Sequence, residues 1–253
     1  MWYSYLQYDV LVTASLLQCF YRRMRLSIDD AADAENRRNL IGWHIYLRSF
    51  EIYIRIISFL KEGAPLKNYQ ITEFCHHFLE QHIRPGDFCI DATAGKGNDT
   101  AFLCQLVGSH GRVLAFDIQQ SAVDATNERL FAEGLSDIGT AILESHANMH
   151  LYAEAGTVDC IMFNFGYLPG GDHSLCTHAD TSIAAIRDGL SLLKKQGMMS
   201  LCIYSGGDTG FEERDAILDY LKQLDPTQYM VLLSCYYNRP NNPPIPVFIL
   251  RLH

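Results

Sequence analysis

Apolar residues recur at helical spacing through the first quarter of the chain. Leu6 and Phe20 share one face of a helix predicted over about residues 1–26, and a second, longer helix follows it. Gly63-Ala64-Pro65 then ends the helical pattern. We therefore predict a helical hairpin as an N-terminal extension over residues 1–68. Its wide apolar faces should pack either on the rest of the chain or on a second copy, which would make a homodimer.

From residue 69 onward, short apolar runs alternate with amphipathic stretches, a pattern typical of an α/β domain over residues 69–253. Strands are predicted at 88–92, 112–118, 138–143, 158–163, 198–204, 230–237 and 246–252, and helices at 69–83, 98–107, 121–133, 181–193 and 212–224. The last strand follows the sixth after a loop too short for a helix, so it should run antiparallel to its neighbours. The predicted fold is a doubly wound, mostly parallel seven-stranded sheet with a ligand crevice at the carboxyl ends of its strands.

The stretch from Asp91 to Thr100, Asp-Ala-Thr-Ala-Gly-Lys-Gly-Asn-Asp-Thr, joins the first strand of this domain to a helix. Gly95 and Gly97 let the backbone turn tightly and approach a ligand, and the helix presents unpaired N–H groups. A dinucleotide fingerprint would need a third glycine where this chain has Thr100. The Asp91 carboxylate is placed to meet a cationic amine, which favours S-adenosylmethionine over a ligand with phosphates. An ordinary turn between strand and helix is the alternative.

Two later segments extend this predicted pocket. Asp117 lies near the end of the second strand, 22 residues after Gly95, a spacing that puts a carboxylate beside the ribose of a bound adenosine. His146 and Asn148 follow the third strand, where folds of this kind contact adenine, and either could supply a polar group. For Asp117, together with Asp91, the alternative is a pair of solvated acids that cap helices. For the segment with His146 and Asn148, the alternative is a plain loop.

The fourth strand leads into Asn-Phe-Gly-Tyr-Leu-Pro-Gly-Gly-Asp, residues 164–172, a composition that suits a shaped active-site loop better than packing. It is reminiscent of the Asn-Pro-Pro-Tyr loop of amino-methyltransferases, in which an amide oxygen holds the acceptor amine and an aromatic ring stacks on the base. Asn164 and Tyr167 could play those parts, and Gly166, Pro169 and Asp172 would shape the acceptor site. A tight turn is the alternative.

A rigid loop rich in proline and amide side chains follows the sixth strand, Asn-Arg-Pro-Asn-Asn-Pro-Pro. Arg239, Asn241 and Asn242 could read a nucleobase edge or a phosphate of the substrate. The same segment could equally be a stiff connector.

Charge and cysteine usage narrow the functional classes. Net charge is −9, yet residues 1–70 hold nine Lys and Arg against seven Asp and Glu, whereas the remainder holds 11 against 22. An acidic domain meets a polyanion only through local patches, such as the basic cluster Arg22, Arg23 and Arg25.

The eight cysteines never form Cys-x-x-Cys, which predicts reduced thiols and no metal site. With no membrane span or signal peptide in the pattern, we expect a cytoplasmic protein.

Four motifs in this order resemble a small bacterial methyltransferase family long called putative rRNA methylases, which includes the enzyme that methylates 5-aminomethyl-2-thiouridine at the tRNA wobble position. They are Asp-Ala-Thr-Ala-Gly-x-Gly-Asn-Asp-Thr, Ala-Phe-Asp-Ile-Gln, Phe-Asn-x-Gly-Tyr-Leu-Pro-Gly-Gly-Asp and Asn-Asn-Pro-Pro. The resemblance covers about residues 70–253 and implies the class I methyltransferase, Rossmann-like fold. It departs from the family at Gly207, where a histidine is usual, and in the N-terminal extension.

The resemblance also implies functional residues. Cofactor contacts fall within the first two motifs, at Asp91, Thr93, Gly95, Gly97, Asn98, Asp99, Thr100, Asp117 and Gln119, with His146 and Asn164 beside them. The acceptor site would lie around Asn164, Gly166 and Tyr167. The predicted function is thus a methyltransferase that uses S-adenosylmethionine and acts on the wobble uridine side-chain amine of tRNA. The alternatives are another RNA position such as one in rRNA, a small-molecule amine, or a non-catalytic protein that binds the cofactor or a nucleoside.

Overall fold

The computed structural model describes residues 70–165, 179–205 and 210–253. The predicted N-terminal hairpin and the domain boundary at residue 68 lie outside the described residues and stay predictions. Four predicted site residues of the acceptor loop also lie outside the described residues, namely Gly166, Tyr167, Pro169 and Asp172.

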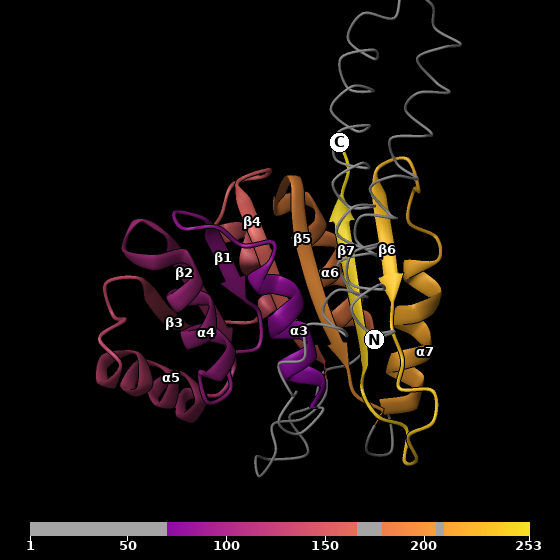
Figure 1. The fold of residues 1–253 in the computed structure, drawn as a ribbon, viewed down its shortest axis with the longest axis horizontal. Coiled ribbons are helices and arrows are strands. Elements are labelled where there is room, and N and C mark those ends of the chain that lie inside the picture. Colours follow the sequence, from indigo (N-terminus) through magenta and orange to yellow (C-terminus); the bar gives the residue numbers. More distant parts are fainter. Residues whose placement is uncertain (1–69, 166–178, 206–209) are drawn as a thin grey trace, which may run out of the picture. The chain divides into compact units, whose positions relative to one another are not determined.

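Seven strands form one sheet in the order β3-β2-β1-β4-β5-β7-β6 (Figure 1). Their bounds are β1 Phe88–Asp91, β2 Arg112–Asp117, β3 Gly139–Leu143, β4 Val158–Phe165, β5 Leu193–Ile203, β6 Tyr229–Leu233 and β7 Ile245–Arg251. Strands β1 to β5 pair in parallel, whereas β7 lies between β5 and β6 and is antiparallel to both. The predicted doubly wound sheet with an antiparallel last strand is therefore confirmed.

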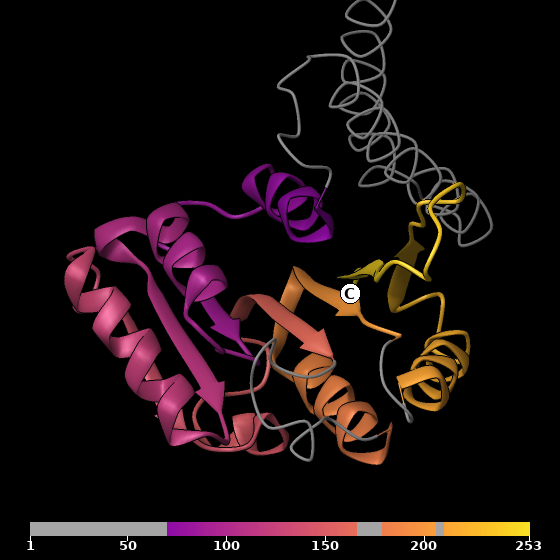
Figure 2. The same cartoon turned by 90° about the horizontal axis from the view of Figure 1, so that it is seen from below.

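Helices cover both faces of this sheet (Figure 2). They are α3 Ile71–Glu80, α4 Asn98–Val107, α5 Gln120–Ala132, α6 Ala179–Leu192 and α7 Gly210–Leu221, with short 3-10 turns at Gly108–His110 and His146–Leu151. Helix α3 and helix α4 lie on one face, and α6 and α7 pack together on the other. Helix α5 packs against β2 and β3.

The central strands are buried on both faces, which explains why their sequences are continuous apolar runs. Ile90 of β1, Phe116 of β2 and Ile161 of β4 are fully buried in the main core, together with residues of α6 and α7. On the face of α3, Phe78 stacks on Phe248 of β7 with ring centroids 4.0 Å apart. The apolar pattern thus positions the carboxyl ends of the parallel strands along one rigid edge.

The start of β5 and the end of β6 depart furthest from the predicted bounds, by five and four residues, whereas the other strand ends differ by at most two residues. Strand β5 begins at Leu193, which pairs with Val158 before the register between β4 and β5 shifts. The intervening Lys194-Lys195-Gln196 is exposed, and Gln196 has φ +67°, so its polar pattern conceals the strand. Strand β6 ends at Leu233 because the chain then turns away into the loop before β7.

The described residues also bear on the cysteines, on membrane-spanning helices and on metal sites. Five of the six cysteines in these ranges are buried and all six are free thiols, with Cys235 exposed. Within the same ranges, no helix has the length and apolar character that crossing a membrane requires. No group of three or more His, Cys, Asp and Glu side chains in this part of the chain is arranged to hold a metal ion.

A tight turn joins β1 to α4, and helix α5 holds it in place. Gly97 precedes the helix with φ +75° and ψ +15°, and its N–H donates to the Ala94 carbonyl over 2.8 Å. From α5, the Thr126 hydroxyl donates to the Gly95 carbonyl and the Arg129 guanidinium to that of Lys96. A Cβ built on Gly97 would lie 3.0 Å from the Thr126 Cα. The turn therefore needs glycine both for its conformation and for space.

We predict that Gly97→Ala destabilises the fold more than Gly134→Ala does. Both glycines have left-handed φ values, +75° and +70°, but a Cβ on Gly134 would meet nothing within 4 Å. Gly134→Ala should therefore cost about 1 kcal/mol of unfolding free energy for backbone strain alone. Gly97→Ala should cost about 2–3 kcal/mol because overpacking against Thr126 is added. Urea denaturation measures both losses, and equal losses would mean that α5 does not constrain the turn.

Candidate functional site

Asp91, the last residue of β1, holds the turn between β1 and α4 in place. Its side chain is fully buried, and one oxygen accepts the Thr100 hydroxyl at 2.6 Å while the other accepts the Thr93 N–H at 3.1 Å. Burial, and next the neighbouring Asp99 carboxylate, raise the pKa of Asp91 to about 7. The carboxylate thus faces Thr93 and Thr100 and has no exposed surface, and its contact with a cationic amine stays a prediction.

Asp117, at the end of β2, lies against the glycine turn as its spacing predicts. Its two carboxylate oxygens accept the N–H groups of Gly95 at 3.0 Å and Gln119 at 2.9 Å. Each oxygen has two lone-pair sites, so the half-buried carboxylate keeps capacity to accept from a ligand hydroxyl. Gln119 itself precedes helix α5. The structure thus brings Asp117, Gln119 and Gly95 together.

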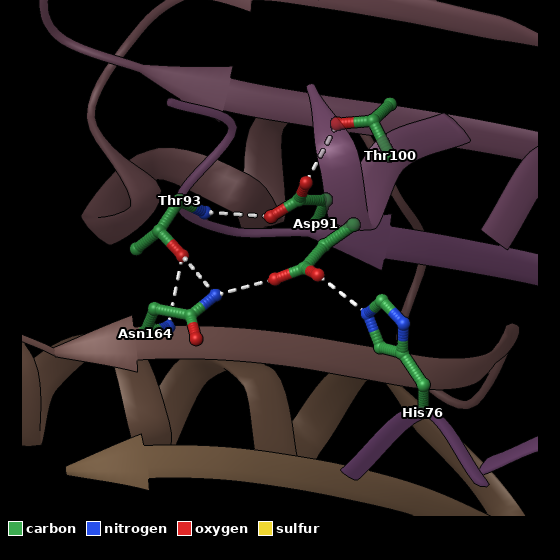
Figure 3. Close-up of polar contacts among 6 residues, drawn as sticks. His76, Asp91, Thr93, Thr100 and Asn164 are labelled. Carbon is green, nitrogen blue, oxygen red and sulfur yellow. Dashed lines mark hydrogen bonds and ion pairs between the residues drawn. The ribbon is translucent and has the colours of Figure 1, made fainter. Parts of the chain in front are cut away.

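Asn164, near the end of β4, is joined by hydrogen bonds to the turn between β1 and α4 (Figure 3). Its backbone N–H donates to the Thr93 hydroxyl at 2.8 Å, and its side-chain Nδ2 donates to Asp99 at 2.7 Å. The same Nδ2 lies 3.5 Å from the Thr93 hydroxyl. A carboxylate only accepts hydrogen bonds, so the amide nitrogen must face Asp99 and the Asn164 oxygen faces the other way.

Asp99 links β4 to α3, two elements that are far apart in the sequence. One oxygen accepts from Asn164, and the other lies 2.5 Å from Nε2 of His76, a residue of α3 (Figure 3). The His76 ring also stacks on Phe102, with centroids 3.7 Å apart and 3° between the ring planes. His76 was not among the predicted site residues. No motif marks it, and the visible signal is a pair of histidines, 76 and 77, in a helix with an apolar face.

Tyr204 is a second residue near the site that was not among the predicted site residues. Asn164 pairs in register with Cys202 of β5, and Tyr204 follows two residues later, so all three side chains lie on one face of the sheet. The Tyr204 N–H donates to the Phe165 carbonyl at 3.0 Å, which extends the pairing beyond β5. Burial raises the pKa of the Tyr204 hydroxyl, so this residue stays neutral beside the site.

His146 packs at the edge of the sheet. Its ring meets those of Phe163 and Phe165 edge to face, and Nδ1 lies 3.2 Å from the Ala92 carbonyl oxygen. Burial lowers the pKa of His146, which favours the neutral ring. Because a carbonyl only accepts, Nδ1 carries the hydrogen and Nε2 is left as an acceptor. Asn148, the other predicted adenine contact, donates to Glu144 at 2.9 Å.

The other predicted site residues differ in how far they are exposed to solvent. Asn98 is exposed at the first position of α4, whereas Thr100, two residues later, is buried. Arg239, Asn241 and Asn242 are exposed in the loop between β6 and β7, and both asparagines have positive φ, +64° and +46°. This loop leaves β6 at the edge where the parallel strands end, as predicted.

The site therefore combines acidic side chains with a directed amide oxygen. Asp99 and Asp117 both act electrostatically on Asp91, which places three carboxylates around the turn. Such a cluster favours a cationic ligand and opposes the approach of a phosphate. The Asn164 amide oxygen adds an acceptor for a hydrogen-bond donor at the end of β4.

Comparisons with known proteins show which family the chain belongs to. A family model described as putative rRNA methylase matches residues 113–250. The chain is 34% identical over 187 residues, 70% of its length and 67% of the relative's, to a chloroplastic tRNA (mnm(5)s(2)U34)-methyltransferase from Arabidopsis thaliana.

Two solved structures share both fold and sequence. One is a putative rRNA methylase from Clostridium thermocellum, with 42% identity and a TM-score of 0.70, which matches 72% of this chain and 98% of that one. The other is a putative methyltransferase from Streptococcus mutans in complex with SAH, with 34% identity, a TM-score of 0.65 and coverage of 72% and 97%. The chain therefore belongs to the putative rRNA methylase family and is a methyltransferase with the class I Rossmann-like fold.

Proposed function

We propose that this chain transfers a methyl group from S-adenosylmethionine to the primary amine of a 5-aminomethyl uridine at the wobble position of tRNA. The observation that carries the proposal is the match over 70% of this chain to a relative named for methylation at U34 of tRNA. The directed Asn164 oxygen at the end of β4 suits an amine acceptor. The family model named for rRNA favours one second candidate, an RNA amine elsewhere.

The acidic turn supports the assignment of the cofactor. S-adenosylmethionine carries a sulfonium and an ammonium group and no phosphate, so Asp91, Asp99 and Asp117 attract it and would repel a pyrophosphate. Asp117 holds the Gly95 N–H and has free lone pairs for ribose hydroxyls. The structure of the relative from Streptococcus mutans contains SAH, the product of such a transfer.

Asn164 would bind and orient the acceptor. When bound, the cofactor supplies an electrophilic methyl group whose bond to sulfur breaks as the amine nitrogen attacks in line. The Asn164 amide oxygen would accept one N–H of the neutral amine, which directs the nitrogen lone pair toward the methyl group. Placement of this kind accounts for much of the rate in reactions that need little acid or base help.

Recognition of RNA would depend on local contacts. Residues 71–253 are strongly acidic, so phosphate contacts must come from separate cationic positions. Arg239 lies exposed on a loop whose shape is fixed by prolines and by the positive φ of Asn241 and Asn242. We propose that this loop contacts the nucleotides next to the target uridine. Homodimer formation, cytoplasmic location and the role of the N-terminal extension remain predictions.

We predict that Asp117→Asn weakens binding of S-adenosylhomocysteine by about ten- to a hundredfold, the range expected for losing hydrogen bonds to a charged group. The neutral amide cannot accept from both backbone N–H groups and also from the ribose. Asp124→Asn is the matched control, because Asp124 is exposed on α5 and pairs only locally with Gln120. Isothermal titration measures both affinities, and thermal melting checks that both variants fold. Wild-type affinity in Asp117→Asn would place the adenosine elsewhere.

We predict that tRNA from a strain lacking the gene accumulates 5-aminomethyl uridine without its methyl group, as measured by mass spectrometry of nucleosides. The wild-type gene should restore methylation, and Asn164→Ala should not, because the acceptor amine loses its oriented partner. Retained binding of S-adenosylhomocysteine by Asn164→Ala would separate loss of acceptor placement from loss of the cofactor pocket. Unchanged tRNA nucleosides with a methyl group missing from rRNA would contradict the tRNA assignment and support the second candidate.

A further inference from the structure

We infer that His76 is a positioning residue of the acceptor site, which acts through Asp99 on the side-chain amide of Asn164. The inference deepens the proposed function and rests on it for the identity of the acceptor. His76 belongs to α3, the helix before the first strand. This helix contributes none of the predicted site residues.

The contact between His76 and Asp99 is short and partly protected from water. Nε2 of His76 lies 2.5 Å from the carboxylate, and the two side chains are 23% and 13% exposed. An ionised carboxylate cannot donate, so Nε2 carries the hydrogen of this bond. Stacking on Phe102 fixes the plane of the His76 ring and therefore the direction of the N–H. His76 thus holds one oxygen of Asp99 at a defined position.

The second oxygen of Asp99 transmits this constraint to Asn164. It accepts from Nδ2 at 2.7 Å, and a flipped amide would set two acceptor oxygens against each other. The other contact of Nδ2, with the Thr93 hydroxyl, is long at 3.5 Å and cannot fix the amide alone. The orientation of the Asn164 oxygen, which faces the acceptor, therefore depends on Asp99 being held by His76.

His77 provides a matched control on the same helix. Its Nδ1 pairs over 3.3 Å with Glu80, whose side chain is half exposed, and the ring contacts Gln81 one turn later. These two contacts of His77 lie within its own helix or at the helix end, whereas His76 reaches across to α4. A purely structural role of His76, as a ring packed on Phe102, would leave the chemistry of Asn164 unchanged once the protein is folded.

The test compares His76→Ala, His76→Gln and His77→Ala in tRNA methylation assays with purified full-length protein. His76→Ala should lower kcat by about ten- to a hundredfold, the effect expected for a misplaced acceptor, with little change in the affinity for S-adenosylhomocysteine. His76→Gln should recover most of the lost rate because its side-chain amide can donate to Asp99 from a similar position. His77→Ala should match the wild type. A wild-type kcat in folded His76→Ala would overturn the inference.

A double-mutant cycle tests whether His76 acts through Asn164. If it does, adding His76→Ala to Asn164→Ala should lower kcat no further, whereas independent effects would multiply and contradict the inference. The NMR signals of the Asn164 side-chain amide give a readout that needs no substrate. They should shift and exchange faster in His76→Ala but not in His77→Ala, and unchanged signals would overturn the inference. If the wild-type protein methylates no tRNA, the proposed function fails, and the NMR result still decides the role of His76.

Discussion

The buried carboxylate of Asp91 is the constraint on which the site depends. It lies beneath the turn between β1 and α4 and ties the first residues after the strand to the first turn of the helix through Thr93 and Thr100. A fully buried carboxylate is costly unless its oxygens are satisfied, so these two bonds fix the turn as well as the acid. The threonine that breaks the dinucleotide fingerprint is therefore the partner that makes a buried acid tolerable at this position.

The same turn explains how one edge of the sheet could hold both the proposed cofactor and the proposed acceptor. Thr93 accepts the backbone N–H of Asn164, which links β1 to β4 at their carboxyl ends. Asp99, one position into α4, holds the Asn164 side chain. Asp117, where we propose that the adenosine binds, and Asn164, where we propose that the acceptor binds, are thus connected through a few residues of one motif. Displacement of this turn would disturb both.

Much of the fold follows from the sequence because its signals are local. The bounds of α4 were predicted residue for residue, from the apolar run before Asp91 and the glycines after it. The antiparallel β7 followed from the short loop before it. The early start of β5 was hidden by Lys194 to Gln196, since pairing with β4 overrides a polar pattern there.

The site was predictable only where chemistry and spacing coincide. Asp117 lies against the turn because strand length and helix length set its distance from Gly95. The burial of Asp91 was not predictable, since exposure of a carboxylate depends on which hydroxyl packs over it. His76 was missed because its partner is 23 residues away, and only the packing of α3 against the sheet brings the two together.

The central claim is that the acidic turn receives the adenosyl group of S-adenosylmethionine or its product and excludes a pyrophosphate. Crystals soaked separately with S-adenosylhomocysteine and with a nicotinamide dinucleotide test it most directly. The account predicts adenosylhomocysteine with its ribose on Asp117 and its sulfur toward Asn164, and an empty turn in the second soak. A dinucleotide with its pyrophosphate on the first turn of α4, and no adenosylhomocysteine at the same place, would contradict it.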